Sequence, residues 1–259
     1  MTQKDLANTG VDCVRARQIA DGVHSVQDAI AQAESHYGRK AESVTLLAAT
    51  KTRDVGEIMA ALRAGVRVIG ENRPQEIVAK AEILRKEAAR ENLSVGVNGK
   101  IPLYLIGQMQ SNKINKVLPL ANGIQSVDGI ELAQKISTRA QNLGLCTDVM
   151  LEVNVSGEST KSGCVPERAI DEALAISSLP ALNLRGFMTL GARVDSEKIV
   201  RSGFAALREI RDCVSEQLAQ DSAKLELSMG MSGDFAWAIA EGSTMVRIGS
   251  AIFGPRAFV

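Results

Sequence analysis

The sequence predicts an α/β fold, a single (β/α)8 TIM barrel with an extra helix at its N-terminus. Two observations lead to this prediction: the chain contains eight short apolar segments of strand type, and helix-like segments alternate with most of them. Together the segments span about 215 residues, which is the size and rhythm of such a barrel. A doubly wound open sheet is the alternative, and the count of eight strands favours the barrel.

The N-terminal part of the chain predicts a tail and then a long helix. Residues 1–12 are polar, and we expect a flexible tail there, followed by one ligand-binding domain over residues 13–259. Apolar residues at three- and four-residue steps predict a helix from Val14 to about Tyr37, and Gly38 ends it.

Eight apolar segments follow along the chain, with helices between most of them. The predicted strands are Val44–Lys51, Val66–Ile69, Leu103–Ile106, Gly123–Val127, Asp148–Val155, Leu184–Leu190, Lys224–Met229 and Met245–Ile248. The predicted helices are Val55–Ala64, Pro74–Ala89, Gly129–Asn142, Pro166–Ser178, Ser196–Ala219 and a short one that runs through Gly242. Two of these helices begin with proline, which suits the first position of a helix.

The composition excludes several classes of partner and site. The 259 residues carry 30 Lys and Arg against 30 Asp and Glu, so no net charge draws the protein to nucleic acid or to acidic membranes. An aromatic content of 3% also argues against base stacking. The four cysteines lack CxxC spacing, so neither a zinc site nor a disulfide framework is predicted. The two histidines both fall in the first predicted helix, so we do not expect a histidine-based triad.

The start of the chain bears on its compartment. Met1–Asp5 lacks the apolar region of a secretory signal, and no apolar run approaches transmembrane length. Isolated thiols suit a reducing compartment. We therefore expect a cytoplasmic protein.

Lys51 ends the first apolar run and is the first candidate for chemistry. An amine at the mouth of an apolar strand has its charged form disfavoured, so we expect a lowered pKa. A lysine with a lowered pKa is a usable nucleophile toward an aldehyde. The alternative is that Lys51 extends its charge into solvent at the strand end.

Glycine-rich turns follow the last two strands, where this architecture commonly binds phosphate. In the first turn, Ser232 could cap the next helix or contact an anion, and Asp234 lies in the first turn of that helix. In the second turn, Gly249 would let backbone amides approach a phosphate, and the Ser250 hydroxyl would assist.

Phosphate-binding turns opposite a strand-end lysine imply a phosphorylated aldehyde as ligand. Pyridoxal 5′-phosphate (PLP), held as a Schiff base, is the obvious candidate. Arg247 points inward from the last strand and could meet the pyridine nitrogen. The alternative for Arg247 is an ion pair with Glu71, Glu152 or Asp128, because charges inside a barrel must be paired.

Sequence blocks spread over residues 20–256 resemble the pyridoxal phosphate homeostasis protein family. The blocks are Leu46–Thr52, Ile69–Asn72, Ile106–Lys113, Val153–Val155, Lys161–Gly163, Leu184–Thr189, Leu227–Ser232 and Gly242–Gly254. The resemblance implies the barrel of the alanine racemase N-terminal domain. One departure lies at Leu103–Leu105, where the family often has Trp-His; the polar residue expected near the mouth is absent there.

The resemblance also implies roles for individual residues. Lys51 matches the lysine that forms the covalent aldimine with PLP, and Arg247 matches the partner of the ring nitrogen. Asn72 matches a residue that lines the pocket. The phosphate contacts correspond to Ser232, Gly249 and Ser250, and the turn that contains Ser232 also supplies Ser228 and Met229 as cofactor-binding candidates.

Two functions fit this set of residues: a PLP carrier that supplies PLP-dependent apo-enzymes, and a PLP-dependent amino-acid racemase. Alanine racemases take a second base, a tyrosine, from a further C-terminal domain that we do not expect here. The tyrosines of this sequence, Tyr37 and Tyr104, are not obvious substitutes. We therefore favour the carrier, as a monomer, with no catalytic residue assigned. Lys113 and Lys161 are expected to be solvated loop charges, or alternatively, for Lys161, a gate or transient PLP acceptor.

Overall fold

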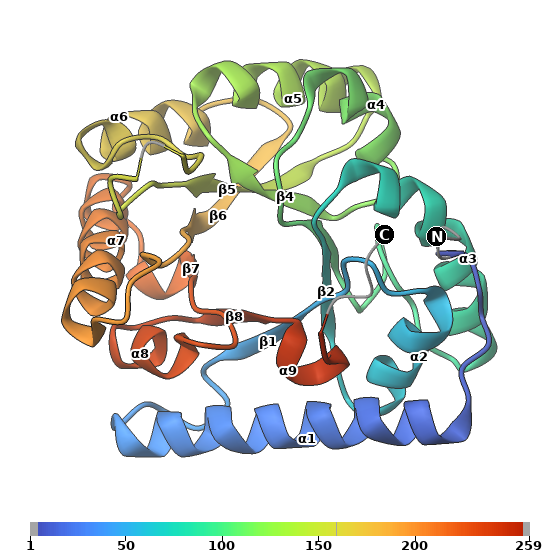
Figure 1. Ribbon diagram of the computed structural model, residues 1–259. Helices are drawn as coiled ribbons and strands as arrows, with labels where there is room; N and C mark the ends of the chain where they lie inside the picture. The colour runs from blue at the N-terminus through green and yellow to red at the C-terminus, as the bar shows by residue number, and fades with distance from the viewer. Residues whose placement is uncertain (1–4, 159, 256–259) are drawn as a thin grey trace.

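Eight parallel strands close into a barrel in the order β1 to β8 within the residues described by the computed structural model, 5–158 and 160–255 (Figure 1). The strands are β1 Thr45–Ala49, β2 Val68–Glu71, β3 Leu103–Leu105, β4 Gly123–Val127, β5 Thr147–Glu152, β6 Leu182–Met188, β7 Glu226–Ser228 and β8 Met245–Ile248. This confirms the predicted barrel.

Helices surround the barrel, and the N-terminal helix is confirmed as well. The α-helices are α1 Cys13–His36, α2 Val55–Arg63, α3 Pro74–Arg90, α4 Ile114–Val117, α5 Ile130–Asn142, α6 Pro166–Ser177, α7 Glu197–Gln217, α8 Phe235–Ala240 and α9 Ser250–Phe253. Two 3-10 helices, η1 Ser111–Lys113 and η2 Ser222–Lys224, complete the described elements. The sequence did not predict α4, α9 or the 3-10 helices, because such short helices show no hydrophobic period.

The strand boundaries differ from the predicted ones by a few residues. β2 begins at Val68 instead of Val66, because the amide of Val66 closes the end of α2 by donating to Ala61 O at 3.1 Å. β1 ends at Ala49, and Lys51 therefore stands in the turn that follows the strand. The run predicted as a strand continues past the last residue that pairs with a neighbouring strand, so hydrophobicity alone does not show where β1 ends.

Two apolar layers form the core, one inside the barrel and one between the strands and the helices. The inner cluster consists of Leu47, Val68, Tyr104, Met150, Met188 and Met245, with Ile106 packed against it. The outer cluster is larger and includes Ala48, Ile69 and Ile248 from the opposite faces of the same strands. Side chains in each strand thus alternate between the two layers.

The N-terminal end of the barrel is closed by charged residues. Arg185 lies 3.2 Å from Glu226 and 4.0 Å from Asp148. Tyr104, from the inner cluster, interacts electrostatically with the same three residues, and burial raises its pKa. Its hydroxyl therefore remains protonated, at the end of the barrel opposite the predicted site.

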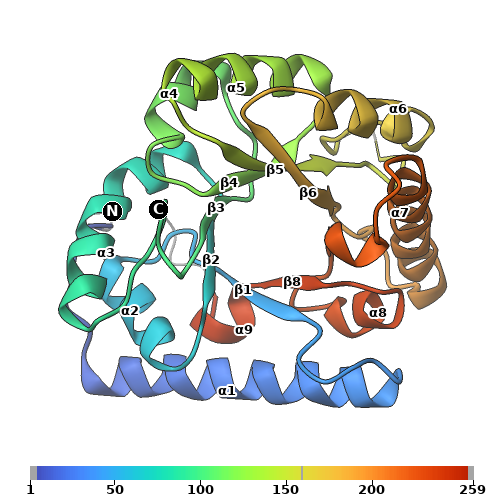
Figure 2. The same ribbon diagram turned by 180° about the vertical axis from the view of Figure 1, so that it is seen from behind.

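α1 lies across the outside of the barrel and contacts α2, α8 and α9 (Figures 1 and 2). Residues just before α1 pack on α2 as well: Val55 N donates to Leu6 O at 3.2 Å, and Gly56 N donates to Asn8 O at 2.9 Å. These amides need acceptors because the first turn of a helix provides none. Leu6 and Asn8 fall within the tail predicted to be flexible and are hydrogen-bonded to the start of α2, while residues 1–4 lie outside the described residues.

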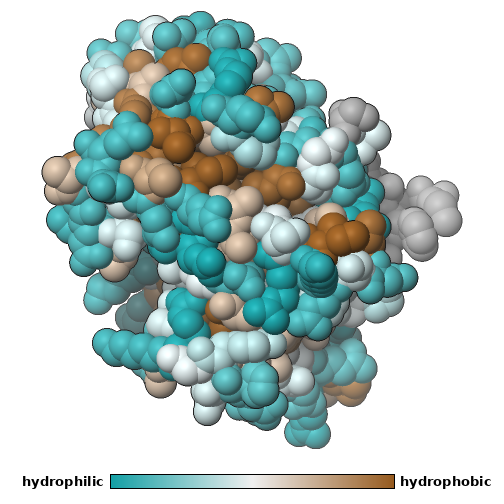
Figure 3. All heavy atoms as spheres, turned by 90° about the vertical axis from the view of Figure 1, so that its left-hand side faces the viewer, coloured by the Kyte–Doolittle hydropathy of each residue, from teal (hydrophilic) through white to brown (hydrophobic). Residues whose placement is uncertain are grey.

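The face of the molecule drawn in Figure 3 mixes hydrophilic and hydrophobic residues. The large hydrophobic residues exposed in the described part of the chain are Val14, Val78, Leu143, Val165, Val194, Ile199 and Met231. Within the same residues, none of the helices is both long and apolar enough to cross a membrane.

Candidate functional site

The predicted site residues meet at one end of the barrel because four neighbouring strands carry them. β7 leads to Ser228, Met229 and Ser232, and β8 carries Arg247 and leads to α9. β1 leads to Lys51, and β2 leads to Asn72. The strands are hydrogen-bonded in the order β7–β8–β1–β2, and all of these residues lie at or beyond the carboxyl ends. This rim is where (β/α)8 barrels place their sites.

Lys51 lies in the turn two residues after the last residue of β1, Ala49. Leu47 is in the inner cluster and Ala48 in the outer one, so the alternation places Ala49 on the inward face. Lys51 itself is half-buried, in a turn formed with Thr52. If the alternation of β1 continues into the turn, position 51 lies on the barrel side of the chain.

Arg247 is buried inside the barrel at 4% exposure. Its guanidinium donates to Ser228 O at 2.5 Å, to Ser228 Oγ at 2.9 Å and to Thr189 O at 2.7 Å. Burial lowers its pKa to about 10, while the charges of Glu152 and Asp234 raise it. Backbone carbonyls therefore hold a guanidinium that remains charged at neutral pH.

The predicted alternative for Arg247 is an ion pair with Glu71, Glu152 or Asp128. Among the described residues, Arg247 has no carboxylate oxygen within ion-pair distance, and Glu71 pairs with Lys80 on the opposite side of β2. Glu152 interacts with Arg247 only at longer range, through its charge. Hydrogen bonds to carbonyls replace the expected ion pair.

Ser228 and Met229 are buried residues at the end of β7 and just after it, next to Arg247 and the core. Ser228 is fully buried, and its hydroxyl donates to Gln125 Oε1 at 2.8 Å while it accepts from Arg247. Met229 is fully buried in the core, and its amide donates to Met245 O at 3.0 Å. The hydroxyl of Ser228 therefore fixes Arg247, and the Met229 side chain packs beneath the turn.

Ser232 and Ser250 lie next to each other. The Ser250 hydroxyl donates to Ser232 Oγ at 3.1 Å, and this contact joins the turns after β7 and β8. Ser232 does not cap α8: the N-cap is Asp234, whose carboxylate accepts from Met231 N at 2.6 Å. The expected capping role of Ser232 is thus wrong, because the helix begins two residues later than that role requires.

Gly249 brings the turn after β8 against β1. A Cβ atom at Gly249 would lie 3.2 Å from Ala49 O, a contact tighter than most side chains make. Gly249 is also the N-cap of α9, the short extra helix that starts with Ser250. A short helix after the last strand is a common part of phosphate sites in this fold.

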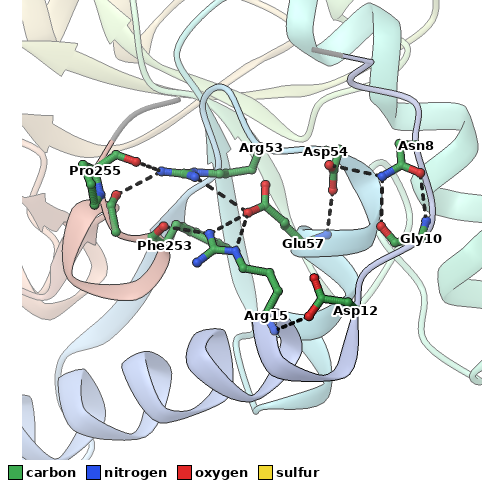
Figure 4. Close-up of polar contacts among 10 residues, drawn as sticks. Asn8, Gly10, Asp12, Arg15, Arg53, Asp54, Glu57, Phe253 and Pro255 are labelled. Carbon is green, nitrogen blue, oxygen red and sulfur yellow. Dashed lines mark hydrogen bonds and ion pairs between the residues drawn. The ribbon is translucent and has the colours of Figure 1, made fainter. Parts of the chain in front are cut away.

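Two arginines fasten α9 to α1 and α2 (Figure 4). Arg53, two residues beyond Lys51, donates to Gly254 O at 3.0 Å and Pro255 O at 2.7 Å. Arg15 of α1 donates to Phe253 O at 2.7 Å and to Glu57 Oε1 at 2.9 Å. These bonds hold the helix that carries Ser250 beside the turn that carries Lys51.

Asn72 follows β2 at the edge of the mouth and is exposed. Gly107, after β3, approaches it so closely that a Cβ atom would lie 2.2 Å from Asn72 O. Gly107 therefore lets the turns after β2 and β3 pack together, with Asn72 at the rim.

Lys161 differs from a solvated loop charge. Its side chain is only 8% exposed, and its amine donates to Glu158 Oε1 and Gly191 O, each at 2.7 Å. The expectation of a solvated charge is wrong, because Lys161 joins the loops that follow β5 and β6. Lys113 is half-buried in η1.

Glu152 is an ionisable residue of the site, and the sequence left open whether it forms an ion pair with Arg247. It ends β5, two residues beyond Met150 of the inner cluster, and is 5% exposed. Burial raises its pKa to about 7, although Arg247 lowers it and Asp128 raises it further. A glutamate that ends an apolar strand near an inward arginine is the pattern that could have identified it.

The site therefore offers an amine in the turn after β1, a buried guanidinium on β8, and two neighbouring hydroxyls at a short helix. An amine can bond an aldehyde carbon, and the hydroxyls with the amides of α9 suit a phosphate. A guanidinium beside a ring nitrogen donates a hydrogen bond and cannot accept one. The site thus combines groups that suit an aldehyde, a ring nitrogen and a phosphate.

Proteins of related sequence are known. The family model described as "Alanine racemase, N-terminal domain" matches residues 25–257. The pyridoxal phosphate homeostasis protein of Vibrio alginolyticus is 35% identical over 240 residues, covering 93% of this chain and 98% of that protein. The protein of the same name from Escherichia coli K12 is also 35% identical over 240 residues, with 93% and 97% covered.

Solved structures extend the similarity. A protein of unknown function from Bifidobacterium adolescentis is 56% identical, with a TM-score of 0.93 over 96% of this chain and all of that one. PipY of Synechococcus elongatus with PLP bound is 29% identical, with a TM-score of 0.73 over 91% of this chain and all of that one. Alanine racemase of Clostridium difficile shares the fold, at 18% identity and a TM-score of 0.70 over 94% of this chain and 57% of that one.

We predict that Glu152→Gln weakens the pH dependence of stability. Because burial raises the pKa of Glu152 to about 7 in the folded protein, its contribution to stability is complete at low pH and is lost as the pH rises through 7. The neutral amide avoids this loss. The variant should match the wild type near pH 4 and exceed its free energy of unfolding by on the order of 1–3 kcal/mol at pH 8.

Urea unfolding at both pH values measures this difference. Glu209→Gln, at an exposed position of α7, is the matched control and should leave the pH dependence unchanged. Parallel stability profiles for Glu152→Gln and the wild type would contradict the prediction.

Proposed function

The chain belongs to the pyridoxal phosphate homeostasis protein family, and we propose that it holds PLP as a Schiff base of Lys51 and supplies it to PLP-dependent apo-enzymes. The observation that carries this proposal is the pairing of β1 with β8, which brings the turn of Lys51 to the same rim as Ser250, whose hydroxyl bonds Ser232. The PLP-bound structure of PipY supports the choice of ligand.

The residues divide into three roles in this proposal. Lys51 supplies the amine, and the Ser232 and Ser250 hydroxyls with the amides of α9 hold the phosphate. Arg247 faces the ring nitrogen, and Asn72 lines the rim. Bound PLP would supply a reactive aldehyde and an electron-withdrawing ring. Arg247 limits the second property, since a guanidinium leaves the ring nitrogen unprotonated.

The carrier role is supported over racemisation by the positions of the tyrosines. Tyr37 caps the C-terminal end of α1, and Tyr104 lies beside the charged residues at the N-terminal end of the barrel. The curated relatives are named as homeostasis proteins. The alanine racemases are 18% identical or less and share only the fold.

We also infer a cytoplasmic monomer. Three of the four cysteines, Cys13, Cys146 and Cys213, are exposed free thiols, which a reducing compartment preserves. Exposed hydrophobic residues such as Val14 on α1 and Val78 on α3 lie on different helices, in support of a monomer. Light scattering coupled to size exclusion would detect a dimer.

Lys51→Ala is expected to abolish covalent PLP attachment. After PLP addition and borohydride reduction, peptide mapping should find the modification on Lys51 in the wild type and no modification in the variant. The visible absorption of the Schiff base should be lost as well. Lys113→Ala is the matched control and should keep both signals. Fixed PLP on Lys51→Ala would contradict the assignment of the lysine.

The double variant Ser232→Ala/Ser250→Ala is expected to bind PLP about tenfold more weakly or worse, because hydrogen bonds to a charged group are lost. Binding of pyridoxal, which has no phosphate, should be unchanged. Ser178→Ala, on the exposed end of α6, is the control. An equal loss for both ligands would show that the two serines do not contact the phosphate.

The PLP-loaded protein is expected to leave amino acids unracemised. Chiral chromatography of a panel of amino acids incubated with the protein measures this, with an alanine racemase as positive control. Turnover on the order of 1 s⁻¹ or faster, typical of enzymes, would contradict the carrier proposal.

A further inference from the structure

Three charged side chains lie buried directly beneath the Lys51 turn, between β2 and α3. Their exposures are 2% for Glu71, 5% for Glu76 and 1% for Lys80. We call them the buried charge cluster. Lys80 occupies a core position of α3, in step with Ile77 and Leu84. Sequence reasoning missed it, although a lysine in the apolar period of a helix is a recognisable signal.

The members of the cluster bind one another. Lys80 Nζ lies 2.8 Å from Glu71 Oε1 and 3.5 Å from Glu76 Oε2. Burying ions is costly, and apolar side chains of similar size would stabilise a core equally well or better. The stability of the core therefore does not explain why these three residues stand here.

The surroundings of the second carboxyl oxygen of Glu71 indicate that Glu71 and Glu76 share a proton. Glu71 Oε2 is buried without a hydrogen-bond partner among the described residues, and Glu76 lies within hydrogen-bonding reach of Glu71. Burial raises the pKa of Glu71 to about 8, although Lys80 lowers it. A protonated Glu71 can donate to the Glu76 carboxylate, and the cluster is then neutral overall.

Each member also bonds a residue that flanks Lys51. Glu71 Oε1 accepts from Thr50 Oγ1 at 2.7 Å, and Lys80 Nζ donates to Thr50 O at 3.1 Å. Glu76 Oε2 accepts from the backbone amide of Thr52 at 3.2 Å. The residues before and after Lys51 are thus both tied to the same buried group.

The turn needs such support at Thr52. Its φ of +64° lies in the left-handed region, which is strongly disfavoured for a β-branched residue. A conformation of this kind persists only where surrounding contacts fix it. The hydrogen bond from Thr52 to Glu76 is one of these contacts.

We propose that Glu71, Glu76 and Lys80 are positioning residues that hold the Lys51 turn in the conformation from which Lys51 points into the barrel mouth. This proposal rests on the proposed function of Lys51. The three residues bond the flanking threonines, Glu71 through the Thr50 hydroxyl and Glu76 and Lys80 through the backbone, so they act on Lys51 through its neighbours.

Glu76→Ala tests the proposal, with Glu34→Ala as a matched control. Glu34 is also a buried carboxylate, 3% exposed, that accepts from a backbone amide, Val44 N at 2.8 Å, but at the opposite end of β1. Glu76→Gln keeps an acceptor for Thr52 and should restore part of the effect. Thr50→Val removes the hydroxyl bonds to Glu71 Oε1 and Gly70 O, leaves the bonds of Lys80 and Glu76 to the turn in place, and serves if Glu76→Ala does not fold.

The first measurement uses the protein without PLP. Hydrogen exchange of the Thr50–Thr52 backbone should accelerate by about tenfold or more in Glu76→Ala, because the opening of the turn becomes less costly. The control should show the wild-type rate for these residues. Unchanged exchange in folded Glu76→Ala, or in Thr50→Val where that variant serves instead, would overturn the proposal.

The second measurement is covalent PLP attachment. The fraction of Lys51 trapped by borohydride at limiting PLP should fall by about tenfold in Glu76→Ala, while inorganic phosphate should compete as in the wild type. Wild-type trapping in a variant whose turn opens faster would overturn the positioning role. If the wild type traps no PLP on Lys51, the proposed function fails, whereas hydrogen exchange still decides whether the cluster holds the turn.

Discussion

The pairing of β1 with β8 is the contact on which the site depends. It closes the barrel, with Leu47 opposite Arg247 and Ala48 opposite Ile248. Lys51 and Ser250 follow these strands, and they lie at the same rim only because the barrel closes. In an open sheet, β1 and β8 could lie far apart. Closure of the barrel thereby brings the turn of Lys51, near the start of the chain, to the same rim as the turn of Ser250, near its end.

The second constraint is that charged side chains inside the fold need polar partners, and the kind of partner differs between Arg247, the buried charge cluster and the far end of the barrel. Arg247 is held by backbone carbonyls and a serine hydroxyl, so it remains available to a ligand. The buried charge cluster is held by internal pairing and by the Lys51 turn. At the far end, the ion pair of Arg185 and Glu226, which closes the barrel, is partly exposed. Buried charges here serve to fix positions more than to stabilise the core.

In the proposed function, Lys51 is the covalent anchor and the turns of Ser232 and Ser250 hold the phosphate; the described tyrosines, Tyr37 and Tyr104, lie elsewhere. Racemases with this fold need a second base, whereas a carrier needs reversible attachment and access. The half-buried Lys51 and the exposed Ser250 fit a site from which a ligand can leave. Fold similarity to racemases therefore does not transfer their chemistry.

The sequence by itself determined the number and order of the strands and the helices that begin with proline, because apolar periods and turn residues act over short distances. For the same reason, it singled out Lys51 as a candidate for chemistry. It also identified Arg247 and the serine turns as candidates. Only the tertiary structure decided what each side chain contacts. Arg247 donates to carbonyls and not to a carboxylate, and Ser250 bonds Ser232. Lys161 donates to Gly191 O and so joins two loops. The buried charge cluster likewise joins α3 to the turn after β1. Such contacts depend on which strands become neighbours, and local sequence does not encode that.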